Sequence, residues 1–202
     1  MSYTSSPPAP KCVPAPANAA ASDGAIRLRP HGPGDIGWII SRHGTLYASE
    51  FDWNLGFEAL VARIAADFID RFDAGREACW IAERRGGDGR VEPLGCVMLV
   101  QARDDAGGQA DQGVAQLRLL LVEPSARGLG VGARLVAECT RFARDAGYRR
   151  LRLWTQSMLV AARSIYQREG YRLIGTEPHR SFGHDLVGEI WEMPLQPEGT
   201  PR

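Results

Sequence analysis

The chain has 202 residues, 44% of them hydrophobic, and its 24 Lys and Arg residues balance 24 Asp and Glu residues. This length and apolar content predict one soluble domain with a sizeable core. The zero formal net charge excludes a broad electrostatic attraction to nucleic acid or to a membrane surface. No stretch resembles a membrane span or a signal peptide, so we expect a cytoplasmic protein.

Composition divides the chain into three parts. Residues 1–24 are rich in Pro, Ala and Ser and show no periodicity. Such a segment cannot bury enough surface to offset its ordering entropy, so we predict a disordered tail. Residues 25–196 form the predicted domain, and residues 197–202 are a short C-terminal tail.

Four cysteines occur without any Cys-x-x-Cys spacing: Cys12, Cys79, Cys96 and Cys139. The last three fall in apolar strand or helix patterns. We therefore interpret them as small core residues in a reducing compartment.

The first half of the domain alternates early helices with strands. Residues 25–29 predict a strand that Pro30 ends, and a helix follows from an Asp35 cap to about Arg42, with Gly44 beyond its end. Residues 45–54 predict a loop or short helix. A second helix is predicted by an apolar stripe comprising Phe57, Leu60, Val61, Ile64, Phe68 and Phe72.

The second half begins with a hairpin. Residues 77–83 and 94–101 predict strands, and a polar loop at 103–113 leads to a third strand that ends at Glu123-Pro124. Further predictions are a helix over 131–146, a strand over 151–155 and a helix over about 158–169. The last two strands are predicted at 171–177 and 188–195, around a loop at 178–187.

The resulting order is β-αα-βββ-α-β-α-ββ. Strands that follow one another without helices, and then a βαβα section, predict an α/β (α+β) fold with a mixed, mostly antiparallel sheet flanked by helices.

A glycine-rich turn joins the third strand to its helix. Its residues are Arg127, Gly128, Leu129, Gly130, Val131 and Gly132. Missing Cβ atoms let backbone N–H groups approach a ligand, and the start of a helix presents unpaired N–H groups at the positive end of its dipole. The combination is typical of a phosphate or pyrophosphate site.

Three phosphate loops compete for this turn, besides a purely structural tight turn. A P-loop fails because Ala133-Arg134, and not Lys-Ser/Thr, follows the last glycine. A dinucleotide fingerprint is formally matched, but no acid for a ribose ends the next strand and too little chain follows for a doubly wound sheet. The third is the acyl-CoA loop of the GNAT acetyltransferases, Gln/Arg-x-x-Gly-x-Gly/Ala, which Arg127, Gly130 and Gly132 fill.

The chain resembles the GNAT family well beyond this loop. The family closes its next helix with Tyr-x-x-x-Gly-Phe, and residues 166–171 read Tyr-Gln-Arg-Glu-Gly-Tyr. From about Ala25 to Leu195 the chain resembles the acetyltransferase domain that some bacterial proteins carry behind a MarR-type winged helix, notably at residues 34–38 and 181–188. No winged helix is expected here.

The resemblance implies where an acyl-CoA would lie. Backbone groups near Leu121 and Val122 would pair with the pantetheine arm, and the N–H groups of residues 127–132 would hold the pyrophosphate. These cofactor-binding residues are Leu121, Val122, Arg127, Gly128, Leu129, Gly130, Val131 and Gly132. The same strand could polarise the thioester carbonyl.

The resemblance also assigns Tyr166 as the acid that protonates the departing thiolate, with a packing aromatic as the alternative. One departure is Leu159, which stands where many relatives carry Asn, so Ser157 or Gln156 would have to supply that contact. The glutamate that some relatives have on the central strand has no counterpart, and Gln116 lies nearest.

The base that deprotonates the amine stays open among Glu50, Glu123, His43, His184, Asp185 and a bound water. His179 and His184 are too isolated in sequence to indicate a metal, so we expect none.

We therefore expect an acetyl-CoA-dependent N-acetyltransferase that acts on a small amine or amino acid by direct transfer in a ternary complex. Trp38, Tyr47, Phe51, Trp53 and the loop at 178–187 would wall the acceptor site. The alternatives are a protein lysine or N-terminal acetyltransferase and a non-catalytic acyl-CoA sensor, with a DNA-binding regulator a distant third. We expect no nucleic-acid or membrane partner, and a monomer or homodimer.

Overall fold

The computed structural model describes residues 24–103 and 110–195. The two tails predicted from composition therefore lie outside the described residues, apart from Gly24. So does Cys12.

The order of elements is the one that the sequence predicts. In chain order they are β1 (Ile26–Pro30), α1 (Asp35–Phe51), α2 (Leu55–Arg71), β2 (Ala78–Arg85), β3 (Val91–Arg103), β4 (Ala110–Val122), the 3-10 turn Pro124–Ala126, α3 (Val131–Asp145), β5 (Arg150–Gln156), α4 (Val160–Arg168), β6 (Arg172–Ser181) and β7 (His184–Pro194).

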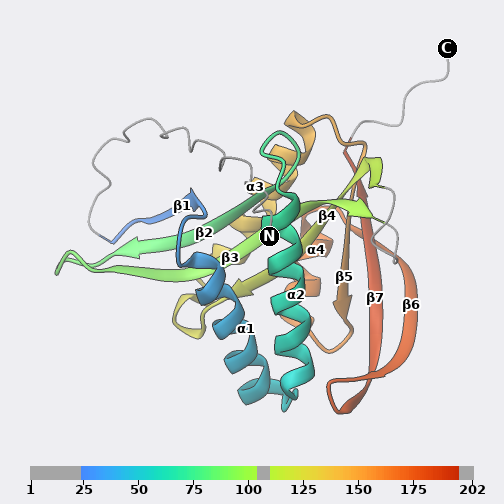
Figure 1. Ribbon diagram of the computed structural model, residues 1–202, viewed down its shortest axis with the longest axis horizontal. Coiled ribbons are helices and arrows are strands. Elements are labelled where there is room, and N and C mark those ends of the chain that lie inside the picture. Colours follow the sequence, from blue (N-terminus) through green and yellow to red (C-terminus); the bar gives the residue numbers. More distant parts are fainter. Residues whose placement is uncertain (1–23, 104–109, 196–202) are drawn as a thin grey trace, which may run out of the picture.

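Seven strands form one sheet in the order β1-β2-β3-β4-β5-β7-β6. Every neighbouring pair is antiparallel except β4 and β5, which are parallel. Helices α1 and α2 cover one face of the sheet, and α3 and α4 cover the other (Figure 1). The predicted mixed, mostly antiparallel sheet flanked by helices is confirmed.

Each face of the sheet buries its own apolar cluster. On one face Leu135 and Cys139 of α3 pack against Leu99 of β3, and on the other Ile39 of α1 and Phe68 of α2 complete a second cluster. Full burial of one such aliphatic or aromatic side chain contributes about 1.5–3 kcal/mol. Cys79, Cys96 and Cys139 are free thiols within these clusters, as predicted.

Helix α1 is longer than the sequence predicts, because it continues through Gly44 to Phe51. A Cβ at Gly44 would lie 2.6 Å from the Glu58 carboxylate of α2, so this glycine serves a close helix–helix approach and does not end a helix. The predicted Asp35 cap is also wrong. Gly34 is the cap, while the Asp35 carboxylate accepts the Gly32 N–H at 2.7 Å and pairs with Arg29.

The predicted loop at 178–187 is wrong as well, because β6 and β7 form a long hairpin through this stretch. Phe182 and Gly183, with φ of 57° and 93°, make a two-residue turn of the kind that matches strand twist. Pro178 is tolerated inside β6 because β6 is the edge strand of the sheet.

Candidate active site

The sheet opens between its two parallel strands. β4 pairs with β5 only where Val114–Leu117 faces Arg150–Leu153. Beyond this point β4 runs on to Val122 and β5 to Gln156 without pairing with each other, although β5 stays paired with β7. The edges that β4 and β5 turn toward each other therefore carry peptide groups with no strand partner.

A β-bulge in β4 lies where the opening begins. Cys96 faces Leu121 and Met98 faces Arg118, so three steps along β4 match two along β3. Leu119, inside the bulge, has a φ of 50°, and its carbonyl accepts a hydrogen bond from the Cys96 thiol at 3.4 Å. A bulge bends its strand, which explains why pairing with β5 stops at Leu117. Left-handed backbone at a non-glycine residue is strained and clusters at functional sites.

The glycine-rich turn lies at the end of β4 and begins α3 at Val131. Gly128 and Gly130 have φ of 79° and 75°, which glycine adopts without strain. Among the described residues no side chain caps α3, so the N–H groups of its first turn stay available. Arg127 Nη2 lies 2.6 Å from Glu50 Oε1, which connects the turn to the end of α1.

Gly132 lets the start of α3 approach its neighbours. A Cβ there would lie 2.7 Å from Ile165 Cδ1 of α4 and 3.4 Å from Val122 Cγ2 of β4. The predicted cofactor-binding stretch, the end of β4 and the α4 turn that carries Tyr166 are therefore adjacent. Leu121 is 4% exposed and its side chain lies in the core, so only its backbone is available to a ligand.

The opening forms the floor of a cleft of about 760 Å³. Its lining comes from β4 and β5 on both sides of the opening, from α1 and α2 above one face, and from α4 at the other. The volume lies within the range of small-molecule sites. Tyr166 lines this cleft, whereas the glycine-rich turn lies beyond the lining, at the end of β4.

Tyr166 is almost fully buried, with 4% of its surface exposed. Burial, together with the neighbouring Tyr47 and Cys139, raises its pKa above the usual value near 10. Burial also raises the pKa of Tyr47, another residue of the cleft, to about 12. Both phenols are protonated at neutral pH, so each can donate a proton or a hydrogen bond and neither can act as a base there.

Leu159, which stands where the family resemblance would place an Asn, lines the cleft with an apolar side chain. Gln156 also lines it, and its amide lies 3.2 Å from His179 Nε2. Ser157 instead donates its backbone N–H to Val187 at 2.9 Å and does not line the cleft. Of the two substitutes that the sequence suggests, the structure brings only Gln156 into the cleft.

The candidate bases are widely separated. Glu50 pairs with Arg127, and the Glu123 carboxylate is held by Arg42 in two hydrogen bonds of 2.6 and 2.7 Å. On the β6–β7 hairpin, His184 Nε2 lies 2.9 Å from the Asp52 carbonyl oxygen, and Asp185 pairs with Arg180. None of these four residues lines the cleft.

His43 is the one candidate base in the cleft lining. Its Nδ1 lies 2.8 Å from the Ile39 carbonyl oxygen, so Nδ1 carries the proton, and Nε2 is buried without a partner among the described residues. Burial lowers the pKa of His43 to about 4. The imidazole is therefore neutral at pH 7.

Aromatic side chains wall one side of the cleft, partly as predicted. Tyr47 and Trp53 line it, while Phe51 lies behind them with ring centroids 5.4 and 5.9 Å away. Trp38 of α1 is partly buried against the core cluster on that face of the sheet and does not reach the lining. Phe182, at the turn of the β6–β7 hairpin, packs on Trp53 at 4.9 Å, so the hairpin does abut this wall.

The sequence reasoning missed Arg118 and Gln116 as a pair in this cleft, where Arg118 Nη1 lies 3.3 Å from Gln116 Oε1. The sequence does contain a sign of this pair, because Gln116 and Arg118 are a polar and a charged residue on one face of an otherwise apolar strand.

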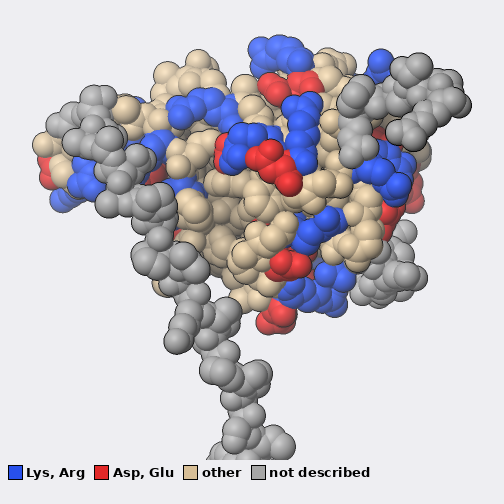
Figure 2. Space-filling view, turned by 90° about the horizontal axis from the view of Figure 1, so that it is seen from above, with Lys and Arg blue, Asp and Glu red and all other residues tan. Residues whose placement is uncertain are grey.

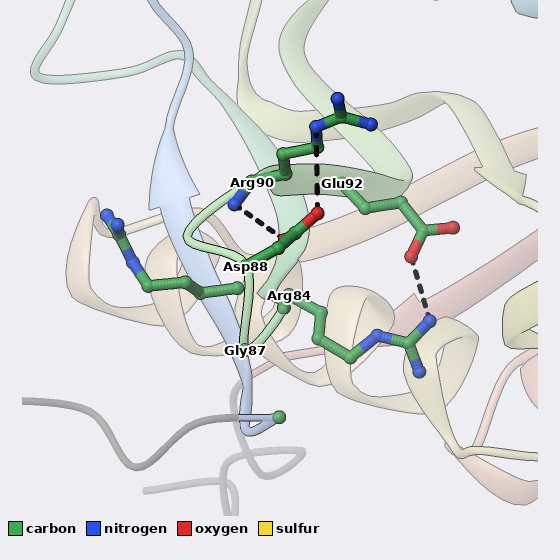
Figure 3. A pocket seen from close by; sticks show the side chains of 8 residues that line it. Arg84, Gly87, Asp88, Arg90 and Glu92 are labelled. Atoms are coloured by element: carbon green, nitrogen blue, oxygen red, sulfur yellow. Dashed lines mark hydrogen bonds and ion pairs between the residues drawn. The ribbon is translucent and has the colours of Figure 1, made fainter.

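A second hollow, of about 670 Å³, lies at the β2–β3 hairpin (Figure 3). Its charged side chains pair with one another, Arg84 with Glu92 at 2.8 Å and Arg90 with Asp88 at 3.6 Å. It borders Gly24, next to residues outside the described range. None of the predicted site residues lines it.

Acidic and basic side chains are interspersed on the face shown in Figure 2. Within residues 24–103 and 110–195, no three His, Cys, Asp or Glu side chains gather as metal ligands, and no helix is long and apolar enough to cross a membrane.

A mixed sheet that opens between a parallel pair, beside a glycine-rich helix start, agrees with the GNAT resemblance in the sequence. The chain matches the family model described as Acetyltransferase (GNAT) family over residues 45–171, more than half of its length. The chain belongs to the GNAT acetyltransferase family.

Solved structures share its fold at low sequence identity. One is yncA of Salmonella typhimurium, described as an acetyltransferase with its cofactor acetyl-CoA (TM-score 0.65, 15% identity, 88% of this chain and 98% of that one). Another is an N-acetyltransferase from Staphylococcus aureus Mu50 (TM-score 0.67, 19% identity, 85% and 99%). A ribosomal-protein-alanine N-acetyltransferase from Brucella melitensis is also similar (TM-score 0.64, 18% identity, 83% and 99%).

Among curated proteins, N-acetyltransferase family 8 member 2 of Rattus norvegicus is 30% identical over 110 residues. The match covers 54% of this chain and 45% of the rat protein, so the chain spans less than half of that relative's length.

Proposed function

We propose that this protein transfers an acetyl group from acetyl-CoA to the primary amine of a small molecule or amino acid, directly in a ternary complex. The observation that carries the proposal is the position of Tyr166. Its protonated phenol lies in the cleft formed where β4 and β5 separate, next to the uncapped start of α3. Family membership supports the acetyl donor, and yncA was solved with acetyl-CoA.

The residues present fit an acyl-CoA. The first turn of α3 and the side chain of Arg127 would hold the pyrophosphate, because unpaired N–H groups and a positive helix end favour a phosphate. Backbone groups of β4 near Leu121 and Val122, along the edge with no strand partner, would pair with the pantetheine amides. When bound, this donor supplies a thioester carbon open to nucleophilic attack.

The chain then supplies two functions, and a bound water supplies a third. The β4 backbone beside the bulge stabilises the oxyanion that forms on the thioester carbonyl. Tyr166, whose phenol is protonated at neutral pH, gives its proton to the departing sulfur. A bound water relays the amine proton to solvent, and His43 is not assigned as the base because burial lowers its pKa to about 4.

The cleft favours a small acceptor. Its volume is about 760 Å³, and the hairpin turn at Phe182 closes against the aromatic wall at Trp53. The free, buried thiols suit a reducing compartment, and we propose the cytoplasm as the location.

The test combines calorimetry with acetyl-CoA and a coupled assay of free CoA over a panel of amines, amino acids and peptides. We expect acetyl-CoA to bind and CoA to be released with at least one small amine or amino acid. Release with peptides alone would indicate a protein acetyltransferase. Binding without any release would indicate a sensor, and a lack of binding would contradict the proposal.

A further inference from the structure

Arg118 lies at the start of the opening between the strands. It directly follows Leu117, the last residue of β4 that pairs with β5, and it enters the bulge that contains Leu119. Its side chain lines the same cleft as Tyr166. Backbone register therefore holds this guanidinium group at the floor of the proposed acceptor site.

The charge of Arg118 has no acidic partner among the described residues. Its only hydrogen bond there is to Gln116 Oε1, at 3.3 Å. Burial lowers its pKa, and the charge of Asp67 on α2 opposes that effect without forming an ion pair. A partly buried guanidinium without a counterion is costly, and a bound anion removes that cost.

Three neighbouring arginines, unlike Arg118, each pair with a glutamate. Arg152, on β5 in the same lining, is neutralised by Glu192 at 2.9 Å, and Arg163 on α4 pairs with Glu189 at 2.9 Å. Arg42, on α1 beside the cleft, is bidentate to Glu123. Arg118 is thus a partly buried arginine whose planar donor fork stays available to a ligand.

Among the described residues, the other unpartnered buried atoms of the lining are two hydrogen-bond donors and one acceptor, His43 Nε2. Within the described residues, Gln101 Nε2 and Trp53 Nε1 are buried without a partner. Gln116 uses its oxygen on Arg118, so its amide nitrogen can donate as well. Donors therefore outnumber acceptors among these groups, which favours a ligand with acceptor oxygens. The acids of the lining do not meet that need, because Glu77 already accepts backbone N–H groups, and Asp67 and Glu177 are exposed.

We propose that the acceptor is an amine that carries a carboxylate, as an amino acid does, and that Arg118 with Gln116 binds this carboxylate in the cleft. This inference rests on the proposed transferase function and narrows its substrate class. A carboxylate matches the fork geometry of a guanidinium in two parallel hydrogen bonds. Lysine side chains and protein N-termini carry no such group beside the amine, so the inference also disfavours the protein acetyltransferase alternative.

The experiment compares matched acceptors, each amino acid against its own amide. The two share amine and side chain, and differ in the carboxylate charge. We expect kcat/KM to favour the acid by about 10- to 100-fold, as for a hydrogen bond to a charged group. The amide's amine loses its proton more easily, so a preference for the acid must come from binding.

Variants locate the effect. Arg118→Gln should bring the ratio of kcat/KM for the acid to kcat/KM for the amide close to one. Arg118→Lys keeps the charge and should retain part of the preference, so it still tests the inference if Arg118→Gln does not fold. Arg152→Gln is the matched control, because its charge already has a partner, and it should leave the ratio unchanged. Acetyl-CoA affinity should be the same in all three variants.

Several outcomes would overturn the inference. One is that no acid outperforms its amide in the wild type, including the case where neither is acetylated. Others are a preference that survives in Arg118→Gln, and a loss of acetyl-CoA affinity in that variant, which would assign Arg118 to the donor. If the wild type fails to bind acetyl-CoA, the proposed function itself is wrong, so the two failures are distinguishable.

Discussion

Two tyrosines line the cleft, Tyr166 and Tyr47, but only Tyr166 could be identified from a sequence motif. Tyr166 stands in the Tyr-x-x-x-Gly-Tyr close of α4, which the family resemblance identifies. Tyr47 carries no motif, and only the packing of α1 over β4 brings it near enough to affect the pKa of Tyr166. A short motif can therefore single out one proton donor, while its neighbours depend on tertiary contacts.

Replacing Tyr166 with Phe should reduce kcat about 10²- to 10⁴-fold with little change in KM for acetyl-CoA, because loss of a general acid affects the chemical step. The ring remains, so packing against Tyr171 at 5.7 Å is kept. Steady-state kinetics with the best acceptor are the measurement. The raised pKa also predicts that Tyr166 adds no falling limb to the kcat profile below pH 10.

Tyr47→Phe is the matched control, since it removes a phenol from the same cleft. If Tyr166→Phe stays within about twofold of wild type, or if Tyr47→Phe costs as much, the assignment of Tyr166 as the acid is wrong.

At the scale of elements, α3 begins and ends with a glycine in the left-handed region. Gly130 at the start has a φ of 75° and Gly147 beyond the end has a φ of 78°, and a Cβ at either would contact nothing within 4 Å. Alanine at either position thus costs about 1–2 kcal/mol of backbone strain. The two sites differ in their ligand, because only Gly130 lies at the proposed pyrophosphate site.

We expect Gly130→Ala and Gly147→Ala to lower the melting temperature by similar amounts. Only Gly130→Ala should weaken acetyl-CoA binding, at least about tenfold, because its methyl group and altered backbone disturb the N–H groups that receive the phosphate. Calorimetry on both variants decides this. Equal affinities in the two variants would favour a purely structural turn.

For the whole molecule, the most direct pH effect on stability comes from His43. Its pKa is about 4 in the folded protein against 6.5 for an unperturbed imidazole. The unfolded chain binds this proton first as the pH falls, so the contribution of His43 is complete above pH 6.5 and is lost between about pH 6.5 and pH 4. The shift corresponds to about 3 kcal/mol.

Denaturant unfolding of wild type and His43→Leu at pH 7 and pH 4 measures this effect. The free energy of unfolding of the wild type should fall by about 3 kcal/mol more than that of the variant over this interval, since Leu does not titrate. Comparing the two falls cancels the titration of the carboxylates. Parallel falls would show that His43 is charged in the folded state.

Local patterns in the sequence specify the order of the elements and the glycine-rich turn. Both signals are local in the sequence. Helical and alternating periodicities involve residues a few positions apart, and the arginine-glycine motif spans only residues 127–132. Where several chemistries compete for one local conformation, the pattern is less informative. Gly44 resembles a helix stop in the sequence, yet it lies inside α1. A glycine is needed there because Glu58 of α2 approaches the backbone closely.

The tertiary structure alone determines the opening between β4 and β5, and with it the cleft. The opening depends on a bulge whose one extra residue in β4 is defined only by register against β3, and on where pairing with β5 ends. The same holds for Arg118. Its sequence neighbours show a charge in an apolar strand, but whether an acid reaches that charge depends on helices and strands far along the chain. In this fold Glu123, Glu189 and Glu192 pair with other arginines, and no described acid forms an ion pair with Arg118, which leaves it for a ligand.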